Sequence, residues 1–307
     1  MPPFFGMAFI GYNPKVLNCY SELDDPIIDI PTTDDAAWSH FPNERWIYNK
    51  LDIATSQGMK CGPVGVEPYT FPVVLKPIYN MFGGGIEARK IDSKYSFNKY
   101  LHPGCMWMQW LEGPHHSHDI MVLNGEPVWH ISFKGYPIGK GMFDYWQVVK
   151  CTEKIILYVL NWIKKYLSSY TGCVCIETIG TRIIEAHLRM GDVDRLGNYN
   201  LMSNIISLYQ DKVWNFKEEI LEFYLFAIWG QSGIQYTISP DIVKEVCSTL
   251  TSYQIDNPDL YYQNPIGGIR LAILNDYNKK SCVAARNRLV SEFRPVVPQY
   301  LREKLIS

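Results

Sequence analysis

An alternating segment near the middle of the chain, residues 173–189 (CVCIETIGTRIIEAHLR), constrains the fold more than any other feature. Apolar and polar residues alternate on both sides of a central glycine, Gly180, as in two strands joined by a tight turn. A three-residue loop at 179–181 places two sets of side chains on opposite faces. The polar face carries Cys173, Cys175, Glu177, Ile183, Glu185 and His187, and the apolar face carries Val174, Ile176, Thr178, Ile184, Ala186 and Leu188.

The polar face of this predicted hairpin brings Glu177 and Glu185 close together, with His187 beside them. Two carboxylates at that separation repel each other unless a cation lies between them. Mg²⁺ suits such a site, because it takes one or two carboxylates together with phosphate oxygens. The alternative is an exposed strand face whose glutamates pair with lysines. Loop length decides between them, since a two-residue loop turns Glu185 away.

A second segment, residues 71–85 (FPVVLKPIYNMFGGG), has the chemistry of a polyphosphate site. Its apolar strand delivers Lys76, and backbone without side chains follows at Gly83, Gly84 and Gly85. The ammonium group neutralises charge, and the bare N–H groups approach phosphate oxygens closely. Taken alone, the segment is also compatible with an ordinary glycine-rich turn.

Between these two segments the sequence predicts a strand at 105–111 that stops at Glu112, where a flat nucleobase can lie against the connecting backbone. A histidine cluster follows, formed by His115, His116, His118 and His130 together with Asp119. The spacing fits a zinc loop, but no cysteine lies nearby in the sequence. We prefer ribose or phosphate contacts, or plain loop histidines.

The remaining pattern predicts an α+β fold of two or three lobes sharing a cleft. Helices are expected at 44–58, 145–168, 215–229, 240–252 and 282–293, and the chain from 212 onward is expected to be helical. Strands are expected at 7–10, 71–76, 86–91, 118–123 and 127–133, the last two paired through a turn at Asn124 and Gly125.

Composition limits the partners of this chain of 307 residues. The net charge of −2 gives no general reason for nucleic-acid binding, and the basic stretch at Lys279, Lys280, Arg286 and Arg288 is best explained as a solvated helix face. Eight cysteines without a CxxC pair, no signal peptide and no apolar run of membrane length lead us to expect a reduced, cytoplasmic protein without membrane contact. The 21 tyrosines and 9 tryptophans leave homo-oligomer formation open.

Taken in order, these segments resemble the ATP-grasp superfamily over about residues 45–192. The resemblance implies phosphate contacts from Lys50 and Lys76, a mobile loop at Gly83, Gly84 and Gly85, and an adenine hinge at Gln109, Trp110 and Leu111 with Glu112 beside them. It implies Mg²⁺ ligands at Glu177 and Glu185, and Arg189 as a contact to phosphate or acyl-phosphate. His187 stands where the family has asparagine, which favours Mn²⁺ over Mg²⁺.

The resemblance also implies an architecture and a reaction. Two α+β lobes are expected to enclose a nucleotide, with a truncated N-terminal lobe at 1–45, a small lobe at 46–111, a large lobe at 112–210 and a helical C-terminal extension at 211–307. The family chemistry is ATP-dependent ligation, in which a small-molecule or peptide carboxylate is phosphorylated and then attacked by an amine. The alternative is a degenerate fold that binds nucleotide for a structural or regulatory purpose without turnover.

Overall fold

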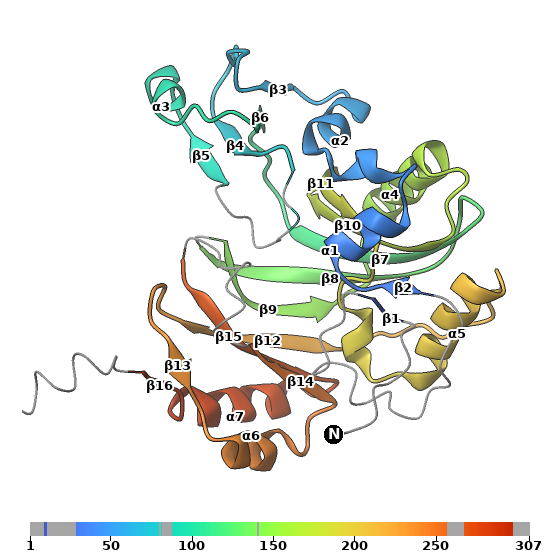
Figure 1. The fold of residues 1–307 in the computed structure, drawn as a ribbon, viewed down its shortest axis with the longest axis vertical. Coiled ribbons are helices and arrows are strands. Elements are labelled where there is room, and N and C mark those ends of the chain that lie inside the picture. The colour runs from blue at the N-terminus through green and yellow to red at the C-terminus, as the bar shows by residue number, and fades with distance from the viewer. Residues whose placement is uncertain are drawn as a thin grey trace, which may run out of the picture.

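Two antiparallel sheets of unequal size form the frame of the protein in the computed structural model (Figure 1), which describes residues 9–10, 29–79, 81, 88–139, 141–256 and 267–296. The larger sheet has eight strands in the order β11-β10-β7-β8-β9-β12-β15-β14, and the smaller has four in the order β3-β6-β4-β5. Helices pack against both sheets, so the α+β class expected from the sequence is confirmed.

The helices and strands alternate irregularly along the chain. The helices are α1 (Asp34–His40), η2 (Arg45–Tyr48), α2 (Lys50–Ser56), α3 (Lys94–Lys99), α4 (Glu153–Tyr166), η3 (Val193–Leu196), α5 (Tyr199–Gln210), α6 (Pro240–Cys247) and α7 (Lys279–Val290). The strands are β1 (Phe9–Ile10), β2 (Ile30–Pro31), β3 (Cys61–Pro63), β4 (Val73–Pro77), β5 (Arg89–Ile91), β6 (Cys105–Gln109), β7 (His115–Leu123), β8 (Glu126–Gly139), β9 (Met142–Val148), β10 (Gly172–Ile179), β11 (Arg182–His187), β12 (Tyr224–Gly230), β13 (Tyr236–Thr237), β14 (Ser252–Ile255), β15 (Ile269–Asp276) and β16 (Arg294–Pro295).

The small sheet is packed on both faces. Leu75 of β4 lies on the face that packs against α3, whereas Val74 lies on the face that packs against α2. Because side chains alternate along a strand, Lys76 leaves β4 on the same face as Val74. That face also contacts Ile184 of the large-sheet hairpin, so β4 delivers its lysine toward the hairpin.

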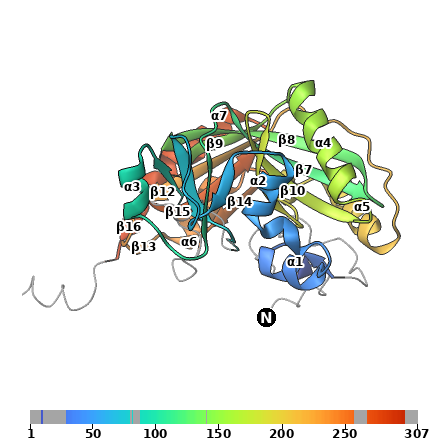
Figure 2. The same ribbon diagram turned by 90° about the horizontal axis from the view of Figure 1, so that it is seen from above.

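The large sheet separates two hydrophobic cores. Val174 and Ile176 of β10 pack against α4 through Val159, while Cys173 lies in the opposite core, which contains Leu208 of α5. The views in Figures 1 and 2 show α4 and α5 at the end of the large sheet that β7 and β10 form. The polar face expected for the hairpin therefore continues the sheet surface that α5 covers farther along.

The turn of the β10–β11 hairpin corrects the expected one. Ile179 pairs with Arg182, so the loop consists of the two residues Gly180 and Thr181 instead of three. Gly180 has a φ of +59°, which glycine adopts readily. By simple alternation of side chains, a two-residue loop would turn Glu185 away from the polar face.

A β-bulge after the turn prevents this outcome. Thr178 pairs with Ile183 and Glu177 with Glu185, so Ile184 is an extra residue on β11. Because of the bulge, Ile183 and Ile184 each lie on the face that was predicted for the other. Ile183 is buried in the core beneath α4, and Ile184 turns toward the small sheet.

The C-terminal part of the chain is not the helical extension that the sequence suggested. Residues 215–229, expected as a helix, contain strand β12, which pairs with β9 and β15 within the large sheet. The apolar run 223–228 is buried between layers, and a short apolar run does not distinguish a buried strand from a helix. Helices α6 and α7 pack on this end of the sheet, as Figure 1 shows at the bottom of the molecule.

Other expected elements are confirmed with shifted ends. The helix expected at 145–168 begins only at Glu153, because 145–148 complete strand β9. The helix expected at 44–58 is divided into η2 and α2, and those expected at 240–252 and 282–293 correspond to α6 and α7. Among the described residues, we find no helix with the length and apolar character that a membrane crossing requires.

Candidate functional site

The centre of the site is a pair of carboxylates on neighbouring strands. Glu177 of β10 lies directly opposite Glu185 of β11, and both side chains leave the sheet on the same face. His187 follows Glu185 by two residues on that face, and its Nε2 lies 3.6 Å from Glu185 Oε1. The hairpin therefore brings together the three residues expected to bind a metal.

Two lysines from the other side of the molecule meet this hairpin. Lys50, the first residue of α2, has its Nζ 2.5 Å from Glu185 Oε1. Lys76 Nζ donates a hydrogen bond of 2.9 Å to the carbonyl of Ile184, the bulged residue. Both lysines are buried, so two ammonium groups converge on the carboxylate pair.

Burial changes the acidity of Lys76. Loss of hydration lowers the pKa of its ammonium group to about 8, although attraction to Glu185 opposes the shift and repulsion by Lys50 adds to it. The group is thus held where a further negative charge would be stabilised strongly.

Asp34 at the start of α1 holds the far end of the hairpin. Its carboxylate accepts from His187 Nδ1 at 2.9 Å and from Arg189 at 3.0 and 3.2 Å. Burial alone would raise the pKa of Asp34, but its contacts with Arg189 and His187 hold it well below its usual value. Because Nδ1 of His187 is engaged by Asp34, Nε2 is the nitrogen left facing Glu185.

Glu177 has a partner of its own on β7. His115 Nε2 lies 2.9 Å from Glu177 Oε2, and the His115 ring stands edge-on against Phe143 and Trp146 of β9. Burial would raise the pKa of Glu177, but the hydrogen bond and charge of His115 lower it to about 2. Glu177 is therefore a carboxylate at neutral pH.

The segment expected as the adenine hinge connects the two sheets. Gln109 ends β6 and is tied to Lys60, whose backbone N–H donates to Gln109 Oε1 at 3.1 Å. Trp110 is partly exposed and carries the ammonium of Lys90 5.2 Å from its ring centre, and Leu111 packs against the small sheet. Glu112 is exposed.

This hinge segment runs along the hairpin turn. The N–H of Gly180 donates to the carbonyl of Pro114 at 2.9 Å. A Cβ on Gly113 would lie 2.9 Å from Gly180 Cα, so the two backbones touch here. The hinge, the carboxylate hairpin and the lysines of α2 and β4 are therefore neighbours in space.

Solved structures have a similar fold. An L-amino acid ligase from Bacillus licheniformis is 13% identical, with a TM-score of 0.58 over 87% of this chain and 77% of that one. A phosphoribosylamine–glycine ligase from Thermotoga maritima is 12% identical, with a TM-score of 0.57 over 82% of this chain and 77% of that one. A carboxyaminoimidazole ribonucleotide synthase from Aspergillus clavatus, solved with ATP, is 11% identical, with a TM-score of 0.55 over 80% and 72%.

These similar structures are ATP-grasp proteins, and a likeness of this extent at such low identity defines the fold. The chain has an ATP-grasp fold. No protein-family model and no curated protein matches the sequence.

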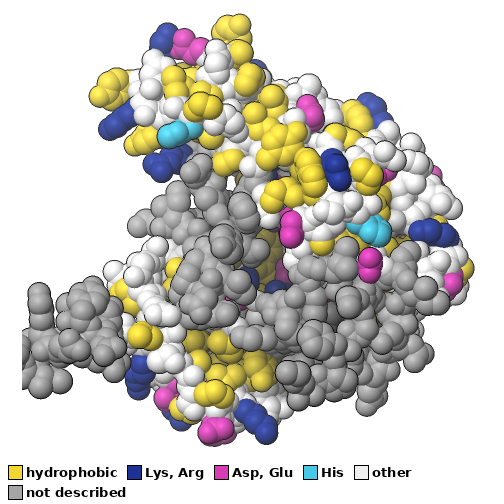
Figure 3. All heavy atoms as spheres, viewed as in Figure 1, with side chains coloured by type: hydrophobic (Ala, Val, Ile, Leu, Met, Phe, Trp, Pro, Cys, Tyr) yellow, Lys and Arg dark blue, Asp and Glu magenta, His cyan; other side chains and the backbone are white. Residues whose placement is uncertain are grey.

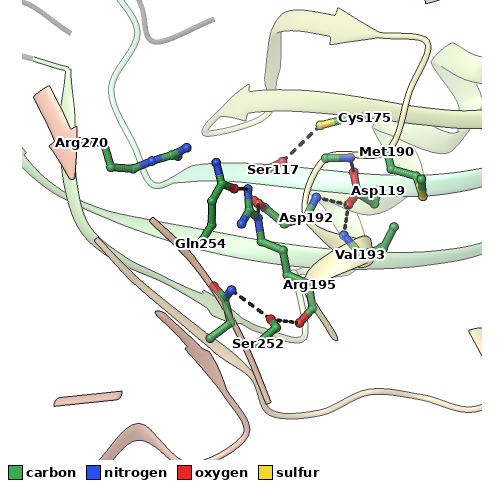
Figure 4. Close-up of polar contacts among 12 residues, drawn as sticks. Ser117, Asp119, Cys175, Met190, Asp192, Val193, Arg195, Ser252, Gln254 and Arg270 are labelled. Atoms are coloured by element: carbon green, nitrogen blue, oxygen red, sulfur yellow. Dashed lines mark hydrogen bonds and ion pairs between the residues drawn. The ribbon is translucent and has the colours of Figure 1, made fainter. Parts of the chain in front are cut away.

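A buried aspartate fixes the loop that follows the carboxylate hairpin (Figure 4). Asp119 of β7 accepts hydrogen bonds from the backbone N–H groups of Gly191, Asp192 and Val193 at 2.8, 2.8 and 3.0 Å. Its pKa is raised to about 6, because burial and the charge of Asp192 outweigh these three donors. A side chain at Gly191 has no room, since its Cβ would lie 2.5 Å from Asp119 Oδ1.

The carboxylate pair fits a divalent cation. Glu177 and Glu185 offer oxygen ligands on one face of the hairpin, and His187 Nε2 points to the same place. In their present contacts the two carboxylates are satisfied by Lys50 and His115, which are positively charged or hydrogen-bond donors. A metal ion bound here would replace donors of the same electrical sign.

The glycine loop at Gly83, Gly84 and Gly85 lies outside the described residues. Arg189, expected to face phosphate, is half-buried with its guanidinium directed to Asp34 and to the carbonyl of Met190.

Sequence reasoning did not find Asp34 as part of the site, and it named His115 and Asp119 only as members of a histidine cluster whose role stayed open. Asp34 gives no local signal, because only the folded chain brings α1 to the hairpin. His115 and Asp119 share the face of Glu177, because Ser117, which lies between them on β7, pairs with Glu177.

Proposed function

We propose that the chain binds ATP between the small lobe, residues 46–111, and the large lobe, residues 112–210, and uses it to join a carboxylate to an amine. The observation that carries this proposal is the convergence of Lys50 and Lys76 on the hairpin of Glu177 and Glu185. Two buried ammonium groups beside two carboxylates suit a metal-bound triphosphate.

The reaction has two steps. An oxygen of the substrate carboxylate attacks the γ-phosphorus, the bond from that phosphorus to the β,γ-bridging oxygen breaks, and ADP leaves. The lone pair of an amine then attacks the acyl carbon, phosphate leaves with the electrons of its C–O bond, and the nitrogen loses a proton. No side chain of the protein forms a covalent bond to substrate in this scheme.

The residues act by charge and position. Lys50 and Lys76 leave their hairpin contacts and stabilise the negative charge of the transferring phosphoryl group. Gln109, Trp110, Leu111 and Glu112 hold adenine along the interlobe segment. The loop of Gly83, Gly84 and Gly85 covers the phosphates and excludes water, which would hydrolyse the acyl-phosphate. Arg189 contacts phosphate or acyl-phosphate after it turns from Asp34.

Glu177, Glu185 and His187 would hold the metal, which supplies charge neutralisation between the phosphates when it is bound. The imidazole is a softer ligand than an amide oxygen and favours Mn²⁺ over Mg²⁺. Substrates are small-molecule or peptide carboxylates, and the L-amino acid ligase with a similar fold makes amino acids the first class to screen. We propose a cytoplasmic location.

A degenerate ATP-grasp protein is the second candidate, and one observation favours it. Arg189 and His187 are both engaged by the same buried carboxylate, Asp34. A phosphate contact from Arg189 would require that network to open. In that case the chain binds nucleotide for a structural or regulatory purpose without turnover.

The test is ADP release with Mg²⁺ or Mn²⁺, screened against pools of amino acids and small acids. Acceptor-dependent ADP release is expected, and it should fall at least a hundredfold in Lys76→Ala and Glu185→Ala. Lys154→Ala and Glu153→Gln, at exposed positions of α4, are the matched controls. Turnover that survives both site substitutions rules out the proposed site, and ATP binding without turnover for any acceptor supports the degenerate candidate.

A further inference from the structure

We propose that the side of β7 that faces away from the ATP site carries a second metal site, a Zn²⁺ site formed by His116, His118 and Cys151. One potential ligand atom from each residue lies within 4.8 Å of the other two. The site uses none of the residues assigned to nucleotide binding, so it is independent of the proposed function.

The strand geometry separates the two sites. His115 points to Glu177 on one face of the large sheet, and the alternation of β7 sends His116 and His118 to the other face. The sequence has no cysteine close to these histidines. The fold supplies Cys151, which lies 33 residues after His118 and two residues before α4 begins.

A backbone contact brings Cys151 into place. The N–H of Val149 donates to the carbonyl of Ser132 at 2.9 Å, and Ser132 pairs with His118 across β8 and β7. The segment between β9 and α4 therefore passes directly beside the histidines. Its thiol reaches the same space as their rings.

His116 has an unused nitrogen. Its side chain is 5% exposed, and its Nδ1 finds no hydrogen-bond partner among the described residues. A buried polar atom without a partner carries a free-energy penalty, because it has lost its hydration without gaining a hydrogen bond. A metal bound by Nδ1 gives this atom a partner directly and removes the penalty. A metal bound by Nε2 instead turns the ring, so that Nδ1 can meet a new partner.

His118 is already oriented as metal-binding histidines are. Its Nδ1 lies 2.8 Å from Ser132 Oγ and its Nε2 lies 3.1 Å from Thr178 Oγ1. A neutral ring donates at one nitrogen and accepts at the other, so the accepting nitrogen is free to exchange a hydroxyl for a metal. The remaining N–H keeps its hydroxyl acceptor, which fixes the ring.

The donor set selects zinc. Two imidazoles and one thiolate are typical of Zn²⁺, and oxygen-seeking Mg²⁺ is disfavoured. On binding, the Cys151 thiol releases its proton to solvent and the sulfur lone pair forms the bond, so no oxidant or reductant is needed. Lys134, paired with His116 across the strands, favours a neutral imidazole.

The ligand atoms must move closer together by a modest amount. Zinc bonds of about 2.0–2.3 Å place tetrahedral ligand atoms roughly 3.3–3.8 Å apart. Compared with the 4.8 Å limit, the largest contraction is about 1.5 Å, which side-chain torsions supply. Water completes the fourth position.

Zinc retention tests the proposal. The full chain, purified without nucleotide, is loaded with Zn²⁺ and dialysed against a weak chelator, and bound metal is then measured by mass spectrometry. We expect one zinc per chain in the wild type and in Glu185→Gln, and at least tenfold weaker retention in Cys151→Ser and His116→Asn. Cys61→Ser, at another half-buried cysteine, is the matched control and should retain zinc.

Cobalt identifies the ligands. With Co²⁺ in place of zinc, the wild type and Cys61→Ser should show a thiolate-to-cobalt charge-transfer band that Cys151→Ser lacks, with unchanged circular dichroism. The proposal is overturned if the wild type retains no zinc, if retention disappears in Glu185→Gln alone, or if the cobalt band persists in Cys151→Ser.

Discussion

Lys76 leaves the end of β4 with its ammonium group buried, close to Glu185 and to a second cation, Lys50. Burial holds the pKa of this group at about 8, more than two units below that of an exposed lysine. The charge on Lys76 is therefore sensitive to what binds beside it. A polyphosphate favours the ammonium form, and so raises the pKa.

ATP binding should consequently be coupled to proton uptake. Above pH 8 most of the free protein has lost the Lys76 proton, so Lys76 must take up a proton from solvent when ATP binds. The affinity for ATP should therefore fall as the pH rises from about 7.5 to 9. Calorimetry in buffers of different ionisation enthalpy measures the protons taken up. Lys76→Arg keeps the charge at every pH and should show no uptake; equal uptake in wild type and Lys76→Arg contradicts the assignment.

Asp34 contacts two residues of the proposed site, His187 and Arg189, without a proposed part in the chemistry. Its carboxylate fixes both His187 and Arg189, and removing one partner of a buried ionic network costs roughly 3–5 kcal/mol. Outer-shell partners of metal ligands also change metal affinity by about 10–100-fold.

Asp34→Asn should therefore lower the free energy of unfolding by about 3 kcal/mol or more, and weaken Mn²⁺ binding at the carboxylate pair about tenfold or more. Urea unfolding and Mn²⁺ titration measure the two effects. Asp35→Asn, at an exposed position in the same turn of α1, is the control. Identical behaviour of the two variants removes Asp34 from the site.

At the scale of elements, the hairpin shows what sequence pattern can and cannot predict. Alternation correctly placed Glu177 and Glu185 on one face, because the burial of Val174 and Ile176 fixes the parity of β10. The loop was wrong by one residue, and the bulge at Ile184 compensated for it. Two neighbouring isoleucines suit either face, so nothing local shows which of them is the extra residue.

Pairings between distant segments could not be predicted from the sequence. The strand β12 resembles a helix in its apolar run, and only its place between β9 and β15 makes it a strand. Contacts of Asp34 with His187, and of Cys151 with the histidines, depend in the same way on packing between elements. The sequence indicates the chemistry of each side chain, but it does not indicate which distant side chain lies beside it.

The loop after β11 gives a prediction at this scale. Gly191→Ala introduces a Cβ that would lie 2.5 Å from Asp119 Oδ1 and 2.8 Å from Cys175 Sγ, both buried. Overpacking of this kind should lower the free energy of unfolding by about 1–3 kcal/mol, measured in urea. Gly65→Ala, where a Cβ meets nothing within 4 Å, is the matched control and should change little.

For the whole molecule, the decisive feature is that the site is shared between two sheets. The small sheet and α2 supply the lysines, the large sheet supplies the carboxylates, and the segment 110–114 joins them. Hydrophobic side chains gather on the upper part of the surface in Figure 3, where Figure 1 places the small sheet, and Tyr69, Tyr95 and Trp110 of that region are exposed. Because the site is shared between the two sheets, a ligand that contacts both of them should stabilise both together.

A non-hydrolysable ATP analogue with Mn²⁺ should therefore raise the thermal unfolding midpoint in a concentration-dependent way. At 100 times the dissociation constant the stabilisation is about 2.7 kcal/mol. Lys50→Ala should reduce this shift at a fixed ligand concentration, as should Glu185→Ala, whereas Lys154→Ala should leave it intact. A shift that is the same in all four proteins places the nucleotide elsewhere.

The contact between Lys50 and Glu185 has a further consequence. While the ammonium and the carboxylate neutralise each other, neither is available to a ligand, so a metal that takes the carboxylate also releases the lysine for phosphate. Metal and nucleotide should then help each other to bind, and by the same factor in both directions, because coupling free energy is reciprocal. A single buried ion pair would thus make the binding of metal and nucleotide cooperative.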